Sequence, residues 1–256
     1  MQFTGERLIP KDKKCGPETE IYKEHFARYE FSCKFLESSF TVLDIACGVG
    51  YGTEMMASKC SKVYGCDIDK ETIDYARKNY SNTNITFQMM DASSLLFQDN
   101  FFDCITCFET MEHLKDHKKT LEEFSRVLKQ NGKLIISTPN KEISLKHNTH
   151  NQFHTNEFTK KEFLEILSIN FSKIDLFSQK LIVNPTIKEK ILKSGLSFGF
   201  KLSQYDRLQL RHKLFKKGTG QKIYQSIDES YQSPDILSYR NEHIPQNFVA
   251  VCFNRK

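Results

Sequence analysis

The stretch LDIACGVGYGTEMM, residues 43–56, decides the fold. A run of apolar residues ends in an acid, Asp44, and a helix-like stretch begins near residue 53. Between them, glycines stand at alternate positions: Gly48, Gly50 and Gly52. A sharp turn needs one glycine, whereas several also let a ligand approach the backbone. The stretch therefore predicts a strand, a ligand-binding loop and a helix.

Strand-like and helix-like segments alternate on both sides of this loop. Strands are expected at 41–47, 62–68, 85–91, 102–110, 133–139, 171–179 and 247–256. Helices are expected at 18–38, 53–58, 70–79, 117–128 and 159–168. Strands joined by helical stretches imply parallel pairing. We therefore predict an α/β fold with a doubly wound, seven-stranded, Rossmann-like sheet.

The expected domain organisation is a single domain over residues 1–256. Residues 1–39 form an N-terminal arm and a covering helix, and residues 40–180 form the ligand-binding core. Residues 181–245 form an insertion whose apolar spacing favours two helices, and residues 246–256 form the last strand.

Composition limits the class of protein. No apolar run is long enough to span a bilayer, and the N-terminus lacks the apolar stretch of a signal peptide, so we expect a cytoplasmic protein with no membrane span. The eight cysteines are scattered, which favours reduced thiols. Cys104 and Cys107 fall three apart in a strand, where they point to opposite faces as core residues rather than as a metal or redox pair.

Charge is concentrated in one segment. The chain carries a net charge of +5, yet residues 181–222 hold ten Lys and Arg against two acids, a charge of +8. Such a segment suits an anionic acceptor, and a solvated helical face explains it equally well. No RNA-binding module is recognisable, so no nucleic-acid partner is expected.

The loop favours one of two cofactor classes. A dinucleotide loop, G-x-G-x-x-G, requires its third glycine at position 53, where this chain has Thr53. Asp44 would also repel a pyrophosphate. A cationic ligand without phosphates fits better, and S-adenosylmethionine is one. Acids end four successive strands, which is where such a sheet binds its ligand: Asp44, Asp67, Asp91 and Glu109.

The segments VLDIACGVGYG, VYGCDID, MMDASSLLF, FETMEHL and RVLKQNGKLIISTPN resemble the successive motifs of class I S-adenosylmethionine-dependent methyltransferases, over about residues 40–180. The resemblance implies S-adenosylmethionine as cofactor and S-adenosylhomocysteine as product. It implies that the methionine part is held by Asp44 and the loop Ala46, Cys47, Gly48 and Gly50. Asp67 should bind the ribose hydroxyls and Ile68 the adenine, with Asp91 and Ala92 at the adenine amino group and Glu109 completing the pocket. Ala46 departs from the glycine of many members.

The flanking segments resemble a narrower group. FTGERLIP (3–10), EHFARYEF (24–31) and NQFHTNEFTKKEF (151–163) are similar to methyltransferases that modify bacterial surface polysaccharides and their precursors, among them enzymes suspected of making the O-methyl phosphoramidate of capsules. The resemblance implies an O-methyltransferase acting on a capsule or surface-glycan precursor, with an anionic phosphoramidate or nucleotide-linked acceptor. Two alternatives stay open: a sugar-hydroxyl methyltransferase with a histidine base, and a binding module without catalysis.

Candidate residues for the acceptor side follow from position. Glu112 and His113 come just after the fourth strand, and His113 is either a base or the cap of the next turn. His147, His150 and His154 share a polar loop; His154 is a further catalytic candidate, and no metal is expected there. On the first helix, Arg28 could bind the methionine carboxylate, with Tyr22, His25 and Tyr29 facing the same space or simply packing. In the basic segment, Arg207 and Arg211 are expected at the acceptor. The oligomeric state is not predicted.

Overall fold

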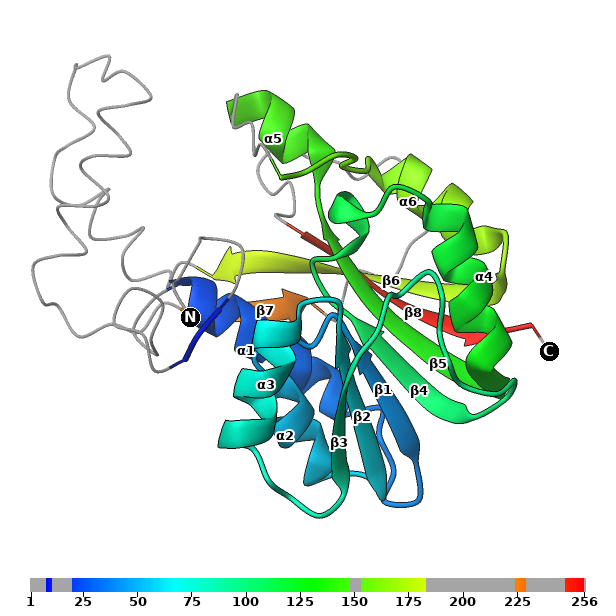
Figure 1. The fold of residues 1–256 in the computed structure, drawn as a ribbon. Helices are drawn as coiled ribbons and strands as arrows, with labels where there is room; N and C mark the ends of the chain where they lie inside the picture. The colour runs from blue at the N-terminus through cyan, green and yellow to red at the C-terminus, as the bar shows by residue number, and fades with distance from the viewer. Residues whose placement is uncertain (1–7, 11–19, 148–152, 183–223, 229–246, 256) are drawn as a thin grey trace, which may run out of the picture. The chain divides into compact units, whose positions relative to one another are not determined.

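The computed structural model describes residues 8–10, 20–147, 153–182, 224–228 and 247–255 (Figure 1). The chain divides into two compact units, Met1–Lys180 with Ser226–Lys256, and Leu181–Gln225. The helices expected in the insertion, together with Arg207 and Arg211, lie outside the described residues. Among the helices that are described, none has both the length and the apolar character needed to cross a membrane.

The central sheet contains the seven expected strands and one more. Its order is β3-β2-β1-β4-β5-β8-β6-β7. The strands are β1 Thr41–Ile45, β2 Lys62–Asp67, β3 Ile85–Met89, β4 Phe102–Cys107, β5 Leu128–Pro139, β6 Phe171–Ile182, β7 Tyr224–Asp228 and β8 Asn247–Asn254. The doubly wound Rossmann-like fold is therefore confirmed, and β7 is the strand that sequence reasoning missed.

Pairing is parallel in the first half of the sheet and mixed in the second. β1 pairs in parallel with β2 and β4, and the same direction continues to β3 and β5. β8 runs antiparallel to both of its neighbours, β5 and β6. The parallel pairing expected of strands joined by helical stretches is thus confirmed from β3 to β5 and does not extend to β8. The chain leaves β1 for β2 on one side and returns to β4 on the other, so the carboxyl ends of β1 and β4 meet at the switch point.

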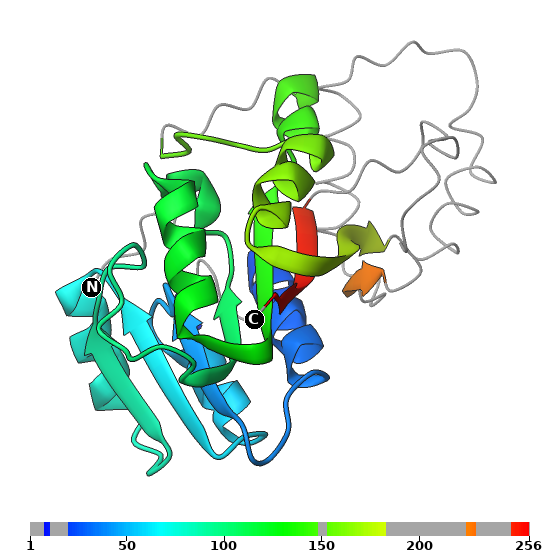
Figure 2. The same cartoon turned by 90° about the vertical axis from the view of Figure 1, so that its right-hand side faces the viewer.

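The helices cover both faces of the sheet (Figures 1 and 2). They are α1 Glu20–Cys33, α2 Tyr51–Ala57, α3 Lys70–Asn79, α4 His117–Val127, α5 Lys141–His147 and α6 Lys160–Ser168, with a short 3-10 helix, η1 Met111–His113. α5 falls where a loop was expected to begin, and α1 is shorter than the expected helix. Capping fixes the starts of three helices: Asp69, Asp116 and Thr159 each accept a backbone N–H.

Because successive side chains of a strand point to opposite faces of the sheet, the hydrophobic core consists of two clusters, one on each face. Val42 and Cys104 lie in the cluster under α1 and α2, whereas Leu43 and Cys107 lie in the cluster under α4 and α6. The two cysteines therefore point to opposite faces, as the strand period requires. Both thiols are buried and free, which confirms the interpretation of this pair as core residues.

Candidate functional site

The glycine loop between β1 and α2 has an unusual backbone. Ala46, Gly48 and Gly50 have φ angles of 57°, 54° and 89°, the left-handed region that glycine tolerates best. The N–H of Gly48 donates to Oδ2 of Asp67 at 3.0 Å, which ties the loop to the end of β2. The Cys47 side chain is buried among residues of α3 and β3, so only its backbone is left to face a ligand.

The three glycines serve different purposes. A Cβ on Gly52 would overlap the ring of Tyr29, and one on Gly50 would lie 2.7 Å from the Phe87 ring. A Cβ on Gly48 would meet nothing within 4 Å. Two of the glycines therefore make room for the protein's own aromatic rings. Beside Gly48 the space is open, and the expected contacts of Gly48 and Gly50 with a ligand stay predictions.

Asp44 supports this loop from beneath. Its carboxylate is 1% exposed and accepts hydrogen bonds from the hydroxyls of Thr53 (2.6 Å), Thr106 (2.8 Å) and Tyr29 (3.2 Å). Burial raises the pKa of Asp44 to about 6, although the hydroxyl donors act in the opposite direction. Since these contacts hold the carboxylate inside the protein, they favour a role in fixing the loop over direct contact with a ligand. Tyr29, expected at the acceptor, is itself buried beneath the loop.

The carboxyl ends of β2 and β3 present polar and apolar groups together. Asp67 ends β2 and is 8% exposed, and Ile68 follows it with 69% of its surface exposed. Met89, at the end of β3, is also an exposed apolar residue. Asp91 is exposed beside the buried Ala92. Carboxylates that accept from hydroxyl and amino groups, next to exposed apolar side chains, form a surface suited to a nucleoside.

A buried arginine lies at the edge between α1 and β6. Arg28 is 1% exposed, donates to Oε1 of Gln179 at 3.0 Å and lies 3.7 Å from Oε1 of Glu109. Its Nε has no hydrogen-bond partner among the described residues. Glu109 accepts from Ser137 and Asn247, each at 2.6 Å. A buried N–H without an acceptor is rare in folded proteins, so this nitrogen is a candidate contact for a ligand carboxylate.

The remaining candidates on α1 make contacts within α1 and with α2. Tyr22 stacks on Phe26 of the same helix, with ring centroids 3.9 Å apart, and Phe26 in turn stacks on Tyr51 of α2. Nδ1 of His25 lies 3.0 Å from the hydroxyl of Tyr51. Burial, and then the charge of Arg28, lower the pKa of His25 well below its ordinary value, which favours the neutral imidazole. These contacts favour packing for both residues, and a role at the acceptor stays a prediction.

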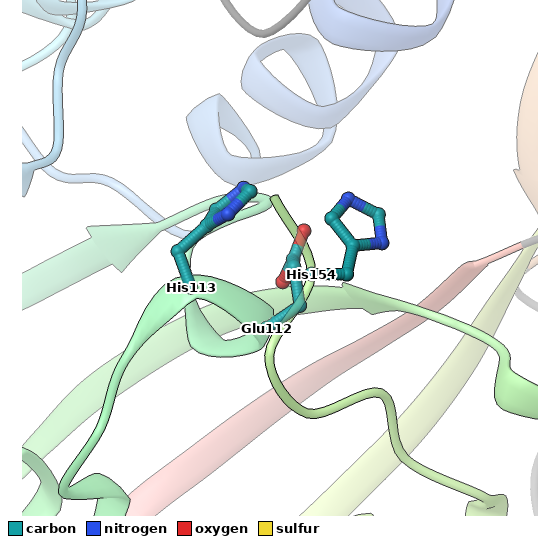
Figure 3. A group of neighbouring side chains, drawn as sticks. All are labelled: Glu112, His113 and His154. Atoms are coloured by element: carbon teal, nitrogen blue, oxygen red, sulfur yellow. The ribbon is translucent and has the colours of Figure 1, made fainter. Parts of the chain in front are cut away.

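Glu112, His113 and His154 come together just beyond β4 (Figure 3). The rings of His113 and His154 are 5.1 Å apart. Nδ1 of His113 lies 2.9 Å from the carbonyl oxygen of Phe153, and Nδ1 of His154 lies 2.7 Å from Oε1 of Glu157. We call these three side chains the EHH cluster. Sequence reasoning named all three but did not predict that they meet.

Glu112 is the buried member of the EHH cluster. It is 1% exposed, and Thr138 donates to its Oε2 at 3.3 Å. Burial raises the pKa of Glu112 well above its ordinary value, and the negative charge of Glu109 adds to the effect. Of the other loop histidines, His147 ends α5 and His150 lies outside the described residues. Among the loop histidines whose side chains the structure describes, His154 joins the cluster.

Several supporting residues escaped sequence reasoning because they act over long sequence separations. Thr106 reaches Asp44, Gln179 reaches Arg28 and Asn247 reaches Glu109. No local pattern marks them. Glu157 is the exception, because a carboxylate three residues after His154 was visible in the sequence.

Comparison with known proteins agrees with this geometry. Residues 43–136 match a sequence family described as a methyltransferase domain. A probable S-adenosylmethionine-dependent methyltransferase of Mycolicibacterium smegmatis is 31% identical over 172 residues, 65% of this chain and 63% of its own. A ubiquinone biosynthesis O-methyltransferase of Coxiella burnetii is 33% identical over 115 residues, 42% of this chain and 49% of its own. This chain thus spans less than two thirds of the length of both relatives.

Solved structures share the fold at low sequence identity. The YcgJ protein of Bacillus subtilis superposes with a TM-score of 0.60 at 20% identity, covering 91% of this chain and all of its own. A SAM-dependent methyltransferase of Archaeoglobus fulgidus gives 0.58 at 18% identity, covering 93% and 95%. The names of the relatives are silent on capsules and glycans. The chain has the Rossmann-like fold of class I methyltransferases, its residues 43–136 match the model of a methyltransferase domain, and relatives named as probable S-adenosylmethionine-dependent methyltransferases align with it.

Proposed function

We propose that this protein is an S-adenosylmethionine-dependent O-methyltransferase that acts on a hydroxyl of a bacterial surface-glycan precursor. The observation that carries the proposal is the EHH cluster. It follows β4, whose carboxyl end lies beside that of β1 and therefore beside the glycine loop. Groups able to handle a hydroxyl proton thus lie at the same sheet edge as the expected cofactor.

The cofactor is proposed to lie along the carboxyl ends of β1 to β3. Gly48 would approach the methionine part, and Nε of Arg28 would meet its carboxylate. Asp67 would accept from the ribose hydroxyls, with Ile68 against the adenine and Asp91 at its amino group. The support for these roles is the exposed, mixed polar and apolar character of that edge.

The reaction is an in-line displacement at the methyl carbon. The acceptor oxygen loses its proton and forms a bond to that carbon with one of its electron pairs. The carbon–sulfur bond breaks, its electrons return to sulfur, and S-adenosylhomocysteine leaves. Because sulfonium is a good leaving group, positioning and deprotonation of the oxygen are what the protein must supply. The EHH cluster can serve as a base, as expected of His113 or His154, or as a cation site from which the proton passes to solvent water.

The acceptor class rests on two supports. A relative named as an O-methyltransferase favours oxygen as the methylated atom. The flanking segments 3–10, 24–31 and 151–163 favour a surface-glycan precursor by resemblance.

A second candidate is an anionic acceptor, a phosphoramidate or nucleotide-linked sugar. It is favoured by the +8 charge of residues 181–222, with Arg207 and Arg211 as proposed contacts. An anionic oxygen needs no base, so this candidate leaves the EHH cluster without a role in deprotonation. The absence of any turnover would instead favour a module that binds S-adenosylmethionine without catalysis.

Calorimetry tests the cofactor proposal directly. S-adenosylmethionine should bind, and Asp67→Ala should weaken binding by roughly 10–100-fold, because each lost hydrogen bond to a charged group costs about 1.5–3 kcal/mol. Asp74→Ala is the matched control, since Asp74 is an acid on the exposed face of α3 that pairs with Lys70. Absence of S-adenosylmethionine binding, or equal binding of NAD, would overturn the proposal.

The acceptor is tested by S-adenosylhomocysteine production. Neutral sugars and nucleotide-linked or phosphorylated sugars should be compared as acceptors. For a hydroxyl acceptor, His113→Ala and His154→Ala should each lower turnover by roughly 100-fold or more while leaving cofactor affinity nearly unchanged. Full activity of both variants would move the preference to the anionic acceptor.

A further inference from the structure

The EHH cluster combines three side chains that commonly ligate metal ions. One ligand atom from each of Glu112, His113 and His154 lies within 4.8 Å of the others. Ligands of one tetrahedral ion with bonds of about 2.0–2.2 Å lie about 3.3–3.6 Å apart. Side-chain movements of up to about 1 Å would therefore bring three such atoms onto one ion.

Hydrogen bonds set which nitrogen of each ring can ligate. The Phe153 carbonyl can only accept, so Nδ1 of His113 is the protonated nitrogen. The Glu157 carboxylate imposes the same form on His154. In a neutral ring of this form, the lone pair is on Nε2. Metal-binding histidines usually carry a carbonyl or carboxylate behind the opposite nitrogen, which fixes both proton and ring orientation.

The backbone holds the two halves of the cluster together. The carbonyl oxygen of Glu112 accepts from the N–H groups of Thr155 (2.8 Å) and Asn156 (3.1 Å) and from the Thr155 hydroxyl (3.0 Å). The segment that carries His154 is thereby fastened to η1, which carries His113. A binding site arranged before its ligand arrives loses less freedom on binding.

Charge at the cluster favours a cation. Glu112 is 1% exposed, and Glu109 adds negative charge nearby. The Thr138 hydroxyl is a neutral donor, and the positive charge of Arg28, which contacts Gln179 and Glu109, offsets only part of this negative charge. A buried carboxylate is costly unless a positive group pairs with it.

We infer that Glu112, His113 and His154 form a binding site for one divalent first-row transition-metal ion. Two imidazole nitrogens and one carboxylate suit zinc, manganese, iron or cobalt, whereas magnesium and calcium prefer oxygen ligands alone. Three protein ligands leave positions open for the acceptor oxygen, whose pKa the ion would lower. This inference rests on the proposed function for what the ion does, and it differs from the sequence-based expectation of no metal.

Cobalt titration tests the site without using activity. The full chain is dialysed against a chelator, and Co²⁺ is then added while its visible absorption and the heat of binding are followed. We expect one Co²⁺ per chain with the absorption of a nitrogen- and oxygen-ligated ion. His154→Ala and His113→Ala should each weaken binding by at least about 100-fold. His117→Ala is the control, because His117 bonds the Met111 carbonyl outside the cluster.

A second variant guards against loss of folding. Glu157 is not a ligand, and Glu157→Gln keeps its size while weakening the acceptor behind His154. It should lower Co²⁺ affinity by about 10–100-fold with an unchanged melting temperature of the metal-free protein. If wild type binds no Co²⁺, or if the cluster variants bind it as wild type does, the inference is wrong. S-adenosylmethionine binding and methyl transfer by chelator-treated protein would then still support the proposed function, whereas loss of cofactor binding with Co²⁺ binding intact would overturn that function alone.

Discussion

At the scale of single residues, Asp44 shows how burial changes the role of an acidic side chain. Its sequence position is that of a ligand contact, but its three hydroxyl donors hold it within the protein. A carboxylate removed from water in this way is protonated more readily than in the unfolded chain.

The raised pKa of Asp44 predicts a pH dependence. Its pKa is 3.8 in the reference state and about 6 in the fold, so the folded state binds the proton more tightly. Asp44 therefore stabilises the fold at low pH, and this contribution is lost as pH rises from about 4 to about 6, by about 3 kcal/mol. Asp44→Asn should remove this part of the slope. Chemical unfolding of both proteins between pH 4 and 7 measures it, and parallel curves would contradict the prediction.

The left-handed backbone of Ala46 predicts that replacing it by glycine stabilises the protein. Alanine at a φ of 57° bears a cost of roughly 1–2 kcal/mol that glycine avoids, partly offset by the greater freedom of glycine in the unfolded chain. Ala46→Gly should be neutral to about 1 kcal/mol more stable. Ala27→Gly, within α1, should instead lose about 1 kcal/mol. Thermal unfolding compares them, and a destabilised Ala46→Gly would argue against strain at this position.

The sequence indicated residues that the structure brings together, but not their contacts. Glu112 and His113 were named from their place just after the fourth strand, and His154 from its place in the motif-like segment 151–163. Their convergence was not visible, since it depends on the hydrogen bonds of Thr155 and Asn156 to Glu112. Contacts with residues that are distant in sequence decide whether an acidic side chain faces a ligand or the protein interior.

At the scale of elements, the glycine loop separates packing from binding. Gly52 leaves room for the Tyr29 ring, whereas Gly48 borders open space at a φ of 54°. The same substitution at the two positions should therefore have different consequences.

Alanine at each glycine tests this difference. Gly52→Ala should destabilise the fold by roughly 1–3 kcal/mol or more, because the Tyr29 ring must move. Gly48→Ala should cost about 1 kcal/mol for its backbone angle and should weaken S-adenosylmethionine binding more than its stability loss explains. Denaturant unfolding and calorimetry measure the two effects. Equal cofactor affinity of Gly48→Ala and wild type would show that no ligand approaches Gly48.

Elements with a strong local pattern were predictable, and those set by tertiary contact were not. The apolar runs of β1 to β5 indicate strands even when their pairing partners are not known. The direction of β8 is set by its pairing with β5 and β6. Its sequence NFVAVCFN is buried on both faces and suits a parallel or an antiparallel strand equally, so the sequence alone does not predict the direction. α5 lies in a polar stretch without apolar periodicity, so its sequence did not predict a helix.

At the scale of the whole molecule, the net positive charge comes from one segment. Residues 181–222 carry +8, and the remainder of the chain is slightly negative. Long-range attraction of an anionic acceptor would come from this segment and would be screened by salt within about 8 Å at physiological ionic strength.

Salt dependence therefore distinguishes the two acceptor classes. With an anionic acceptor, KM should rise with salt, and replacing Arg207 and Arg211 together by alanine should raise it several-fold at low salt. Cofactor affinity should stay unchanged. Lys118→Ala with Lys161→Ala removes the same charge from the exposed faces of α4 and α6 and should change KM little. Unchanged kinetics of the arginine variant with the true acceptor would assign those arginines to a solvated surface.

The place of β8 in the sheet has a consequence for biosynthesis. The strand lies between β5 and β6, yet it follows both in the chain. On the ribosome, β5 and β6 must therefore wait with unpaired backbone edges until residue 254 has emerged from the exit tunnel. Such edges invite pairing with other nascent chains. Translation rate and chaperone supply should consequently govern the yield of this protein, and a premature stop before residue 247 should give aggregate rather than a smaller folded product.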